Sequence, residues 1–300
     1  MGLFASQLGY AISAVTYSLG GGFLGDKFVS VCHAKWISYK YNIPFLYTPF
    51  SYSDQFTMAV NERHASDREF AGHRQVILKD KDMVVDPAAN ILYVVPYFAE
   101  THFEAYVCPN CFTIDWTDRG FIEELRRFIK PRFQLTSPEI PTGYITVAVH
   151  VRKGTGFDDP NVGQYAPYKL PPDSYYIEQL KRIADMFSGT ALFVYIFTDH
   201  DRPLDLVNKY RIAANKDNLT FACREAGNAY NRNVLDDFFG FSKFDCLIRP
   251  ESNFSIVGSK LKDYMVQISP YHSSMQNGAP IIDQVKVEIK NEQGTFVEII

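Results

Sequence analysis

An alternation of buried-strand and helix patterns in the second half of the chain constrains the fold most strongly. Tyr144–Val151 is a run of apolar and β-branched residues, which is typical of a parallel strand covered on both faces. Asp173–Ser188 then spaces its apolar residues along one helix face, and Gly189, a common residue just past a helix end, follows it. Leu192–Thr198 is a second buried-strand run. This order predicts a βαβ unit with parallel strands.

The same alternation continues through several more elements. The sequence predicts, in turn, a helix over Leu204–Ile212, a strand over Leu219–Cys223, a helix over Val234–Phe241, a strand over Cys246–Ile248 and a helix over Phe254–Leu261. Repeats of this kind predict a doubly wound α/β domain from about residue 140 to about residue 270. Val285–Ile300 alternates around a Glu-Gln-Gly turn, which predicts a terminal β-hairpin.

The first half of the chain opens in the same way. It predicts a strand over Ala11–Tyr17, a glycine loop over Gly20–Gly25, a helix over Asp26–Tyr41, strands over Ile43–Tyr47 and Ile91–Val95, and a helix over Phe121–Ile129. Gln134–Thr142 is polar, contains two prolines and is the best candidate linker. The chain therefore divides into a first domain of residues 1–137 and a second of residues 138–300.

Composition excludes several classes of protein. The hydrophobic fraction of 46% allows a large core, so the chain is not disordered as a whole. Lys and Arg number 30 against 34 Asp and Glu, a balance that argues against a surface built to bind nucleic acid. No apolar run of about 20 residues occurs, Met1–Leu8 lacks a basic start, and five cysteines are too few for a disulfide-stapled domain. We expect no integral membrane segment and a cytoplasmic location.

A basic segment follows the first strand of the second domain. His150, Arg152 and Lys153 stand at the carboxyl end of that strand, the edge at which open α/β sheets bind ligands. Two cations and an imidazole suit an anionic group, and the guanidinium fork fits two phosphate oxygens. The alternative is a solvated basic loop at the surface.

Two further segments stand at the same edge of the predicted sheet. Ser252, Asn253, Phe254 and Ser255 lie between a strand and a helix, where hydroxyl and backbone N–H groups can hold a phosphate. Ordinary N-capping by the first of these serines is the alternative. Asp199 ends the second strand, where it can accept hydrogen bonds from a base or ribose or can simply form a turn.

The first domain has a glycine-rich loop between its first strand and helix. Backbone at Gly21, Gly22 and Gly25 can approach a ligand closely because no side chain intervenes. Gly20, Gly22 and Gly25 fit the spacing of a dinucleotide fingerprint, but no acid about 20 residues on is well placed for a nicotinamide cofactor.

Metal-binding patterns are weak in this sequence. Cys108 and Cys111 form a single C-x-x-C pair with only His102 nearby, whereas zinc needs more ligands. Asp80–Asp82 has the letters of a D-x-D motif but lies in the first domain. We therefore expect no metal site and no cofactor.

The order of these motifs resembles that of the α1,2/α1,6/protein-O-fucosyltransferase superfamily. Gly20–Lys27 is similar to the glycine loop of its first domain, and His150–Lys153 to its H-x-R-R motif. Val194–Asp199 is similar to the second motif and Asp236–Ser255 to the third. The resemblance implies a GT-B-like α/β fold, with two Rossmann-like doubly wound domains facing a cleft: an N-terminal acceptor-side domain and a C-terminal nucleotide-sugar (donor) domain.

The resemblance also implies roles for residues of this chain. Arg152 would bind the β-phosphate of a donor such as GDP-fucose and stabilise charge as the sugar leaves. His150 and Asp199 would hold the base or ribose, and the serine-rich segment would cradle the pyrophosphate without a metal. The donor-binding residues implied in this way are Gly21, Gly22, Gly25, His150, Arg152, Lys153, Asp199, Ser252, Asn253, Phe254 and Ser255.

The sequence departs from the superfamily pattern at two positions. Lys153 stands where a second arginine is usual, and Thr155 stands where an acid commonly follows. Inverting transfer needs a general base near the acceptor hydroxyl. Asp158 and Asp159, three and four residues after the threonine, are candidates for that base, and Asp26 is a third.

Three functions follow from these observations. The leading one is a glycosyltransferase that moves a sugar, with fucose from GDP-fucose favoured, to a glycan, glycoconjugate or other hydroxyl acceptor by metal-independent inverting displacement. The missing acid at Thr155 motivates the second, a non-catalytic relative that binds a nucleotide sugar or carbohydrate. The third is an NAD(P)-dependent enzyme that uses the glycine loop.

Overall fold

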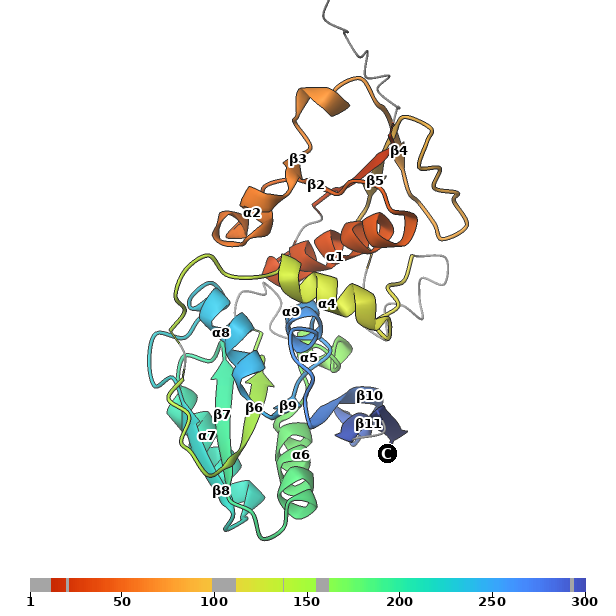
Figure 1. Cartoon of the computed structure of the whole chain (residues 1–300). Helices are drawn as coiled ribbons and strands as arrows, with labels where there is room; N and C mark the ends of the chain where they lie inside the picture. The colour runs from red at the N-terminus through yellow and green to blue at the C-terminus, as the bar shows by residue number, and fades with distance from the viewer. Residues whose placement is uncertain (1–11, 20–21, 99–111, 137, 155–161, 292–293) are drawn as a thin grey trace, which may run out of the picture. The chain divides into compact units, whose positions relative to one another are not determined.

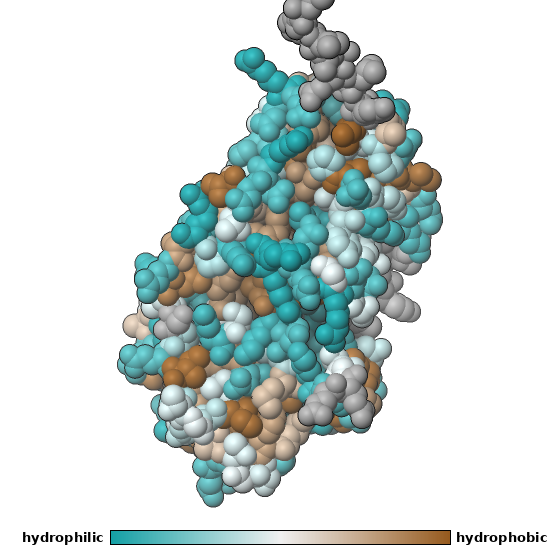
Figure 2. All heavy atoms as spheres, viewed as in Figure 1, coloured by the Kyte–Doolittle hydropathy of each residue, from teal (hydrophilic) through white to brown (hydrophobic). Residues whose placement is uncertain are grey.

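The computed structural model describes residues 12–19, 22–98, 112–136, 138–154, 162–291 and 294–300. The chain divides into two compact units, and the described residues pass from the first to the second between Phe133 and Gln134. The sequence places its domain boundary slightly later, between residues 137 and 138. Within the described part of the chain, no helix combines the length and apolar character needed to cross a membrane. On the face seen in Figure 2, hydrophobic residues form separate groups among hydrophilic ones.

A seven-stranded sheet organises the second unit (Figure 1). Its strands are β6 (Ile145–Val151), β7 (Leu192–Thr198), β8 (Leu219–Cys223), β9 (Cys246–Ile248), β10 (Val266–Gln276), β11 (Ala279–Asn291) and β12 (Gly294–Ile299). They lie in the order β12-β11-β10-β9-β6-β7-β8. The five strands β10, β9, β6, β7 and β8 pair in parallel, whereas β11 and β12 are antiparallel.

The order of the parallel strands creates a switch point in the sheet. From β6 the chain proceeds outward through β7 to β8, then returns to place β9 on the other side of β6 and continues to β10. The connections that leave β6 and β9 therefore diverge, and ligands of open α/β sheets bind in the crevice formed there at the carboxyl ends of the strands.

Two apolar layers cover this sheet because alternate strand residues point to opposite faces. On one face, Val147, Val149 and Val151 pack with residues of α6 (Asp173–Met186) and α7 (Pro203–Ala214). On the other face, Ala148 and Leu247 pack with aromatic residues around the 3₁₀ helix η3 (Phe241–Lys243). The short helices α5 (Val162–Tyr165), α8 (Val234–Gly240) and α9 (Asn253–Ser259) complete the unit.

The main difference from the sequence predictions in this unit is β10. No strand is expected over residues 266–276, yet β10 pairs with both β9 and β11. Its residues Gln267 and Ser269 are polar and still buried, so they give no apolar signal. The antiparallel pairing of β11 with β12 falls where the sequence predicts a hairpin.

The first unit contains a smaller sheet. Its elements are β1 (Ala14–Tyr17), α1 (Leu24–Tyr41), β2 (Leu46–Tyr47), η1 (Ser53–Gln55), α2 (Met58–Asn61), β3 (Arg63–His64), η2 (Arg68–Phe70), β4 (Arg74–Ile77), β5 (Ile91–Val95) and α4 (Arg119–Phe128). The order β1-β5-β4 is parallel throughout, and β2 pairs with β3. The chain is thus a mixed α/β protein with parallel sheets.

A charged side chain fixes α1 against α4 in this unit. The ammonium of Lys35, which is largely buried, lies 2.9 Å from Glu124 and 3.7 Å from Glu62. It also lies 4.9 Å from the centre of the Phe128 ring, which adds a cation–π contact. Helix α1 ends where Asn42 adopts the left-handed conformation with φ of 51°.

Candidate functional site

The predicted motifs of the second unit meet at the carboxyl edge of its sheet. Val151 pairs with Thr198 and Val149 with Ile248, so the loops after β6, β7 and β9 begin at nearly the same level. These loops carry the basic segment, Asp199 and the serine-rich segment. The site therefore lies at the switch point between β6 and β9, where ligands of such sheets bind.

The buried imidazole ring of His150 packs against aromatic side chains at this site. Its ring lies 5.1 Å from the ring of Phe241 and 5.5 Å from that of Phe254. Burial, and then the positive charges of Arg152 and Arg249, lower the pKa of His150 to about 3. The imidazole is consequently neutral near pH 7 and is a poor general base there. Its Nδ1 atom has no hydrogen-bond partner within the described part of the chain.

Lys153 is held at both its backbone and its side chain. Its backbone N–H donates to Asp199 Oδ1 at 2.6 Å, and its ammonium pairs with Asp173, the first residue of α6. Lys209 and Tyr210 donate to the same Asp173 carboxylate at 2.6 and 2.7 Å. Burial alone would raise the pKa of Asp173, but these hydrogen bonds outweigh it and lower that pKa to about 2.

This arrangement separates the two cations of the basic segment. The ammonium of Lys153 is paired with a carboxylate, so it anchors the loop to α6. The half-buried Arg152 stands between this anchor and the buried His150. The loop therefore has a fixed position, which favours precise placement of the guanidinium group.

The serine-rich segment is buried and internally hydrogen-bonded. Ser252 caps α9 by accepting from the backbone N–H of Ser255, and the two hydroxyls lie 2.9 Å apart. The Ser255 hydroxyl also lies within hydrogen-bonding distance of the carbonyl oxygen of Pro250, at 3.0 Å. Asn253, the first residue of α9, is buried, and the half-buried Phe254 contacts His150. The N-capping role of Ser252 is thus present in the structure.

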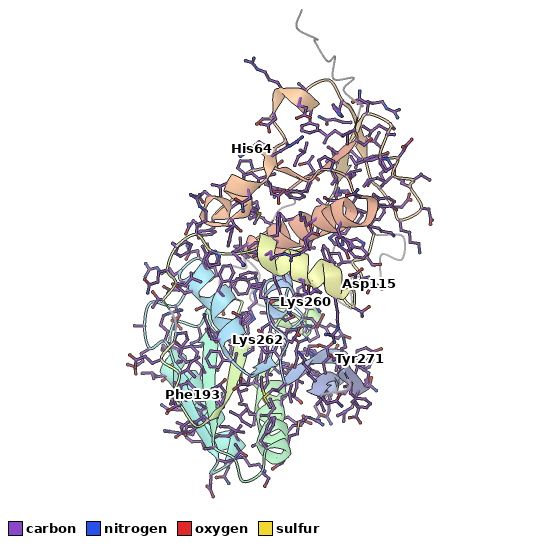
Figure 3. The ribbon with its side chains drawn as sticks, in the orientation of Figure 1. His64, Asp115, Phe193, Lys260, Lys262 and Tyr271 are labelled. Atoms are coloured by element: carbon purple, nitrogen blue, oxygen red, sulfur yellow. The ribbon has the colours of Figure 1, made fainter. Side chains whose placement is uncertain are left out.

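A buried ion pair lies at the start of this segment. Arg249 Nη1 donates to Glu251 Oε1 at 2.8 Å, and both side chains are almost completely buried. Figure 3 shows Lys260 where α9 ends, with Lys262 just beyond it. Burial, and then the charge of Arg249, lower the pKa of Lys260 to about 8. The α9 face of the sheet near the site is therefore polar as well as aromatic.

The structure adds two residues that the sequence analysis did not single out. Arg224 directly follows β8, and its Nη2 atom donates to Asp237 Oδ1 on α8 at 2.6 Å. Burial raises the pKa of Asp237 to about 6; Arg224 opposes this shift, and the charges of Asp236 and Asp199 add to it. In the sequence, only the position of Arg224 indicates its place: it directly follows a predicted strand and so lies at the same sheet edge as Asp199.

The glycine loop belongs to the first unit. Gly22 has φ of 98°, and a Cβ there would overlap the Asp26 carboxylate, so this position requires glycine. Gly25 is buried within α1. The hydroxyl of Tyr97 donates to Asp26 Oδ1 at 3.4 Å.

Several sequence-predicted residues lie outside the described part of the chain. They are Gly20, Gly21, His102, Cys108, Cys111, Thr155, Asp158 and Asp159. Asp80 forms an exposed turn by accepting from the backbone N–H of Asp82 at 3.1 Å. Among the described residues, no three His, Cys, Asp or Glu side chains gather where they could hold a metal ion.

Comparison with solved structures identifies the fold. The chain is similar to a mutant of Arabidopsis thaliana FUT1 in complex with GDP, with 10% identity, coverage of 97% of this chain and 75% of that chain, and a TM-score of 0.52. It is also similar to POFUT1 in complex with GDP-fucose, with 11% identity, coverage of 87% and 96%, and a TM-score of 0.47. Its similarity to NodZ alpha-1,6-fucosyltransferase soaked with GDP-fucose covers 92% of this chain and 98% of that chain, with 13% identity and a TM-score of 0.45.

Sequence comparison gives less than structural comparison. Neither the protein-family models nor the curated proteins give a match. At these identities the structural likeness establishes the fold alone, and the superimposition on FUT1 extends over nearly the whole chain. The protein has a fucosyltransferase-like fold.

Proposed function

We propose that this protein is a glycosyltransferase that transfers fucose from GDP-fucose to a hydroxyl group of a glycan or other glycoconjugate. The proposal includes the GT-B arrangement, with residues 138–300 as the donor domain and residues 1–137 as the acceptor-side domain. The observation that carries it is the convergence of His150, Arg152 and Asp199 at the switch point of the sheet. The fold similarity to FUT1 in complex with GDP supports the choice of donor.

Electrostatics at the switch point favours an anionic ligand. The charges of Arg152 and Arg249 both act against protonation of His150, so the local potential is positive. A bound pyrophosphate would meet this potential in a partly buried site, where charge-assisted hydrogen bonds are stronger than in water. This local field exists although the whole chain carries a net charge of −4.

Each residue then receives a role in transfer. Arg152 contacts the β-phosphate and stabilises the negative charge that develops as the bond from the sugar carbon to the phosphate oxygen breaks. His150 and Asp199 hold the base or ribose, and Phe254 supports the His150 ring. The segment Ser252–Ser255 lines the pyrophosphate position.

Single displacement needs a proton acceptor as well. The acceptor hydroxyl attacks the sugar carbon from the side opposite the leaving GDP, and its proton passes to a general base. We propose Asp158 or Asp159 for this base. Positive side chains neutralise the leaving group in this scheme, so the reaction requires no metal.

Transfer assays with matched variants test the proposal. GDP-fucose is incubated with a panel of glycan acceptors in the presence of a chelator, and products are followed by mass spectrometry. We expect a product larger than its acceptor by one fucosyl group, lost in Arg152→Ala and kept in Arg211→Ala, which removes an exposed arginine of α7. Absence of any product with the parent protein would contradict the transferase assignment.

A second function has one observation in its favour. Thr155 occupies the position where an acid commonly follows the basic motif, which suits a protein that binds the donor without catalysis. Such a protein would bind GDP-fucose in calorimetry but would neither transfer nor hydrolyse the sugar. Donor hydrolysis measured without any acceptor distinguishes the two functions.

A further inference from the structure

The strand β12 forms one edge of the seven-stranded sheet. Within the described residues it pairs with β11 on one side and with no strand on the other. Val285 and Ile300 exchange both backbone hydrogen bonds, at 2.9 and 3.0 Å. In an antiparallel pair, residues whose backbone groups bond to the neighbouring strand alternate with residues whose backbone groups point away from it. The backbone groups of Glu298 and Phe296 therefore also point toward β11. Thr295, Val297 and Ile299 therefore turn their N–H and C=O groups away from the sheet.

This edge has few of the features that normally prevent strand pairing. Proteins protect edge strands with charged side chains, especially lysine, and with proline, bulges or very short strands. β12 has six residues, contains neither lysine nor proline, and pairs with β11 without a register shift; its one charged residue is Glu298. Phe296 is 55% exposed, Val297 48% and Ile299 40%. At the opposite edge of the sheet, in contrast, the one residue of β8 in the exposed class is the polar Thr220.

Self-pairing of β12 has a register that satisfies both backbone and charge. In an antiparallel pair related by a two-fold axis at Val297, each Val297 faces its own copy. Thr295 then lies opposite Ile299 of the second copy, so all three outward residues exchange backbone hydrogen bonds. Phe296 lies opposite Glu298 of the second copy. A two-fold axis at Glu298 would instead place two carboxylates opposite each other, which is unfavourable.

The strand behind this edge presents no net charge to an approaching copy. Val297 and Ile299 lie beside Glu288 and Lys286 of β11, respectively. The ammonium of Lys286 lies 2.5 Å from the Glu288 carboxylate, so the two charges compensate each other. Lys290, beside Thr295, is likewise compensated by Asp263 at 2.8 Å. Two copies can therefore approach edge to edge without like charges in opposition.

We propose that a second copy of this chain pairs with β12, and that the sheets of two copies join into one continuous sheet through Val297. The interaction is β-strand addition between identical edges, in which main-chain hydrogen bonds give affinity and the side-chain pattern selects the register. It is independent of the proposed enzymatic activity, because β10 and β11 separate β12 from β9, the strand that borders the candidate site.

The two-fold axis gives a sharp test. Size-exclusion chromatography with light scattering should show a dimer for the parent chain. Val297→Asp and Val297→Lys each place like charges opposite each other, so each variant alone should be monomeric. An equimolar mixture of the two should recover a dimer containing one chain of each kind, identified by native mass spectrometry.

A backbone variant and a control complete the experiment. Val297→Pro removes an N–H that points away from β11, so it should abolish the dimer while leaving the β11–β12 pairing and the circular dichroism spectrum unchanged. Ile212→Asp, which replaces an exposed apolar residue of α7, should remain dimeric. A monomeric parent, a dimer of Val297→Pro, or an equimolar mixture that stays monomeric would overturn the proposal, whatever other protein the edge binds.

Discussion

The Asp199 carboxylate accepts a hydrogen bond from the backbone N–H of Lys153 at 2.6 Å and thereby joins the loops that follow β6 and β7. The contact lies one residue beyond Arg152, so Asp199 restrains the backbone that presents this guanidinium group. Asp199 can thus support donor binding in two ways, by contact with the nucleotide and by holding the Arg152 loop.

Replacement of Asp199 tests this contact. We expect Asp199→Ala to weaken GDP binding about tenfold or more, because a hydrogen bond to a charged acceptor contributes about 1.5–3 kcal/mol. Asp199→Asn keeps an acceptor oxygen and should retain part of the affinity. Calorimetry measures both variants, with exposed Asp201→Ala as the control. Unchanged affinity in Asp199→Ala would exclude both roles.

The Lys153–Asp173 pair predicts a dependence of stability on pH. The folded pKa of Asp173, about 2, lies below its ordinary value of 3.8, so the folded state binds the proton less tightly than the unfolded chain. The contribution of the ionised Asp173 to the stability of the folded state is complete above about pH 4 and is lost as the pH falls toward 2. We expect Asp173→Asn to lower the free energy of unfolding by about 1–2 kcal/mol near pH 7 and by less near pH 3.

Urea unfolding of the parent and Asp173→Asn at the two pH values provides this measurement. Asp185→Asn is a suitable control, because Asp185 is an exposed residue of the same helix that also pairs with a lysine. A difference between parent and Asp173→Asn that stays constant with pH would show that the ion pair does not account for the effect.

His150 predicts acid sensitivity over a different pH range. Its folded pKa of about 3 lies below the ordinary value of 6.5, so the unfolded chain binds more protons between these values. The stability of the folded state is therefore complete above pH 6.5 and falls as the pH drops through this window. His150→Phe should reduce the loss of stability between about pH 7 and pH 5 by about 1–2 kcal/mol.

Thermal or urea unfolding at several pH values separates His150 from other histidines. The exposed His272 serves as the control, since its imidazole pairs with Asp283 at the surface. If His150→Phe shows the same acid profile as the parent, the imidazole is not buried in its neutral form.

The Arg224–Asp237 pair predicts coupling between two side chains. Both are half-buried, and removal of one leaves its partner partly desolvated and unpaired, so Arg224→Ala should destabilise the fold by about 1–3 kcal/mol. The double variant Arg224→Ala/Asp237→Ala should lose less than the sum of the two single changes. A double-mutant cycle by chemical denaturation measures this coupling, and additive losses would show that the 2.6 Å contact contributes little.

Gly240 predicts a steric effect in the aromatic layer. A Cβ at this position would lie 2.7 Å from the Phe197 ring, which is itself packed against Phe241 and Phe244. Gly240→Ala should therefore destabilise the protein by about 1–3 kcal/mol through overpacking. Gly72→Ala, where nothing lies within 4 Å of the added atom, should have little effect on the melting temperature. Equal effects of the two substitutions would contradict the packing around Phe197.

The sequence predicts best the strands that carry apolar residues on both faces and are covered on both. β6 and β7 are continuous apolar runs because helices or aromatic residues cover both sides of them, and this makes them easy to recognise. β10 is not predicted because it has no continuous apolar run: Val266 and Ile268 alternate with polar residues. One of these, Gln267, is buried and donates to Glu288 at 2.5 Å, a contact with a separate strand that the sequence does not reveal.

The sequence likewise predicts only part of the candidate site. Position at a sheet edge pointed to His150, Arg152 and Asp199, and the structure brings their loops to one level. The pairing of Lys153 with Asp173 and the shifted pKa of Asp237 depend on contacts between separate elements, which spacing along the chain does not reveal.

Titration of GDP into the protein tests most directly whether the switch point between β6 and β9 is a nucleotide-sugar site. With a chelator present, calorimetry should show GDP binding with a dissociation constant between micromolar and millimolar, tighter than that of UDP or ADP, and at least about tenfold weaker in Arg152→Ala than in Arg211→Ala. Absence of heat with GDP, or equal affinity in Arg152→Ala and the parent, would contradict the assignment of this site.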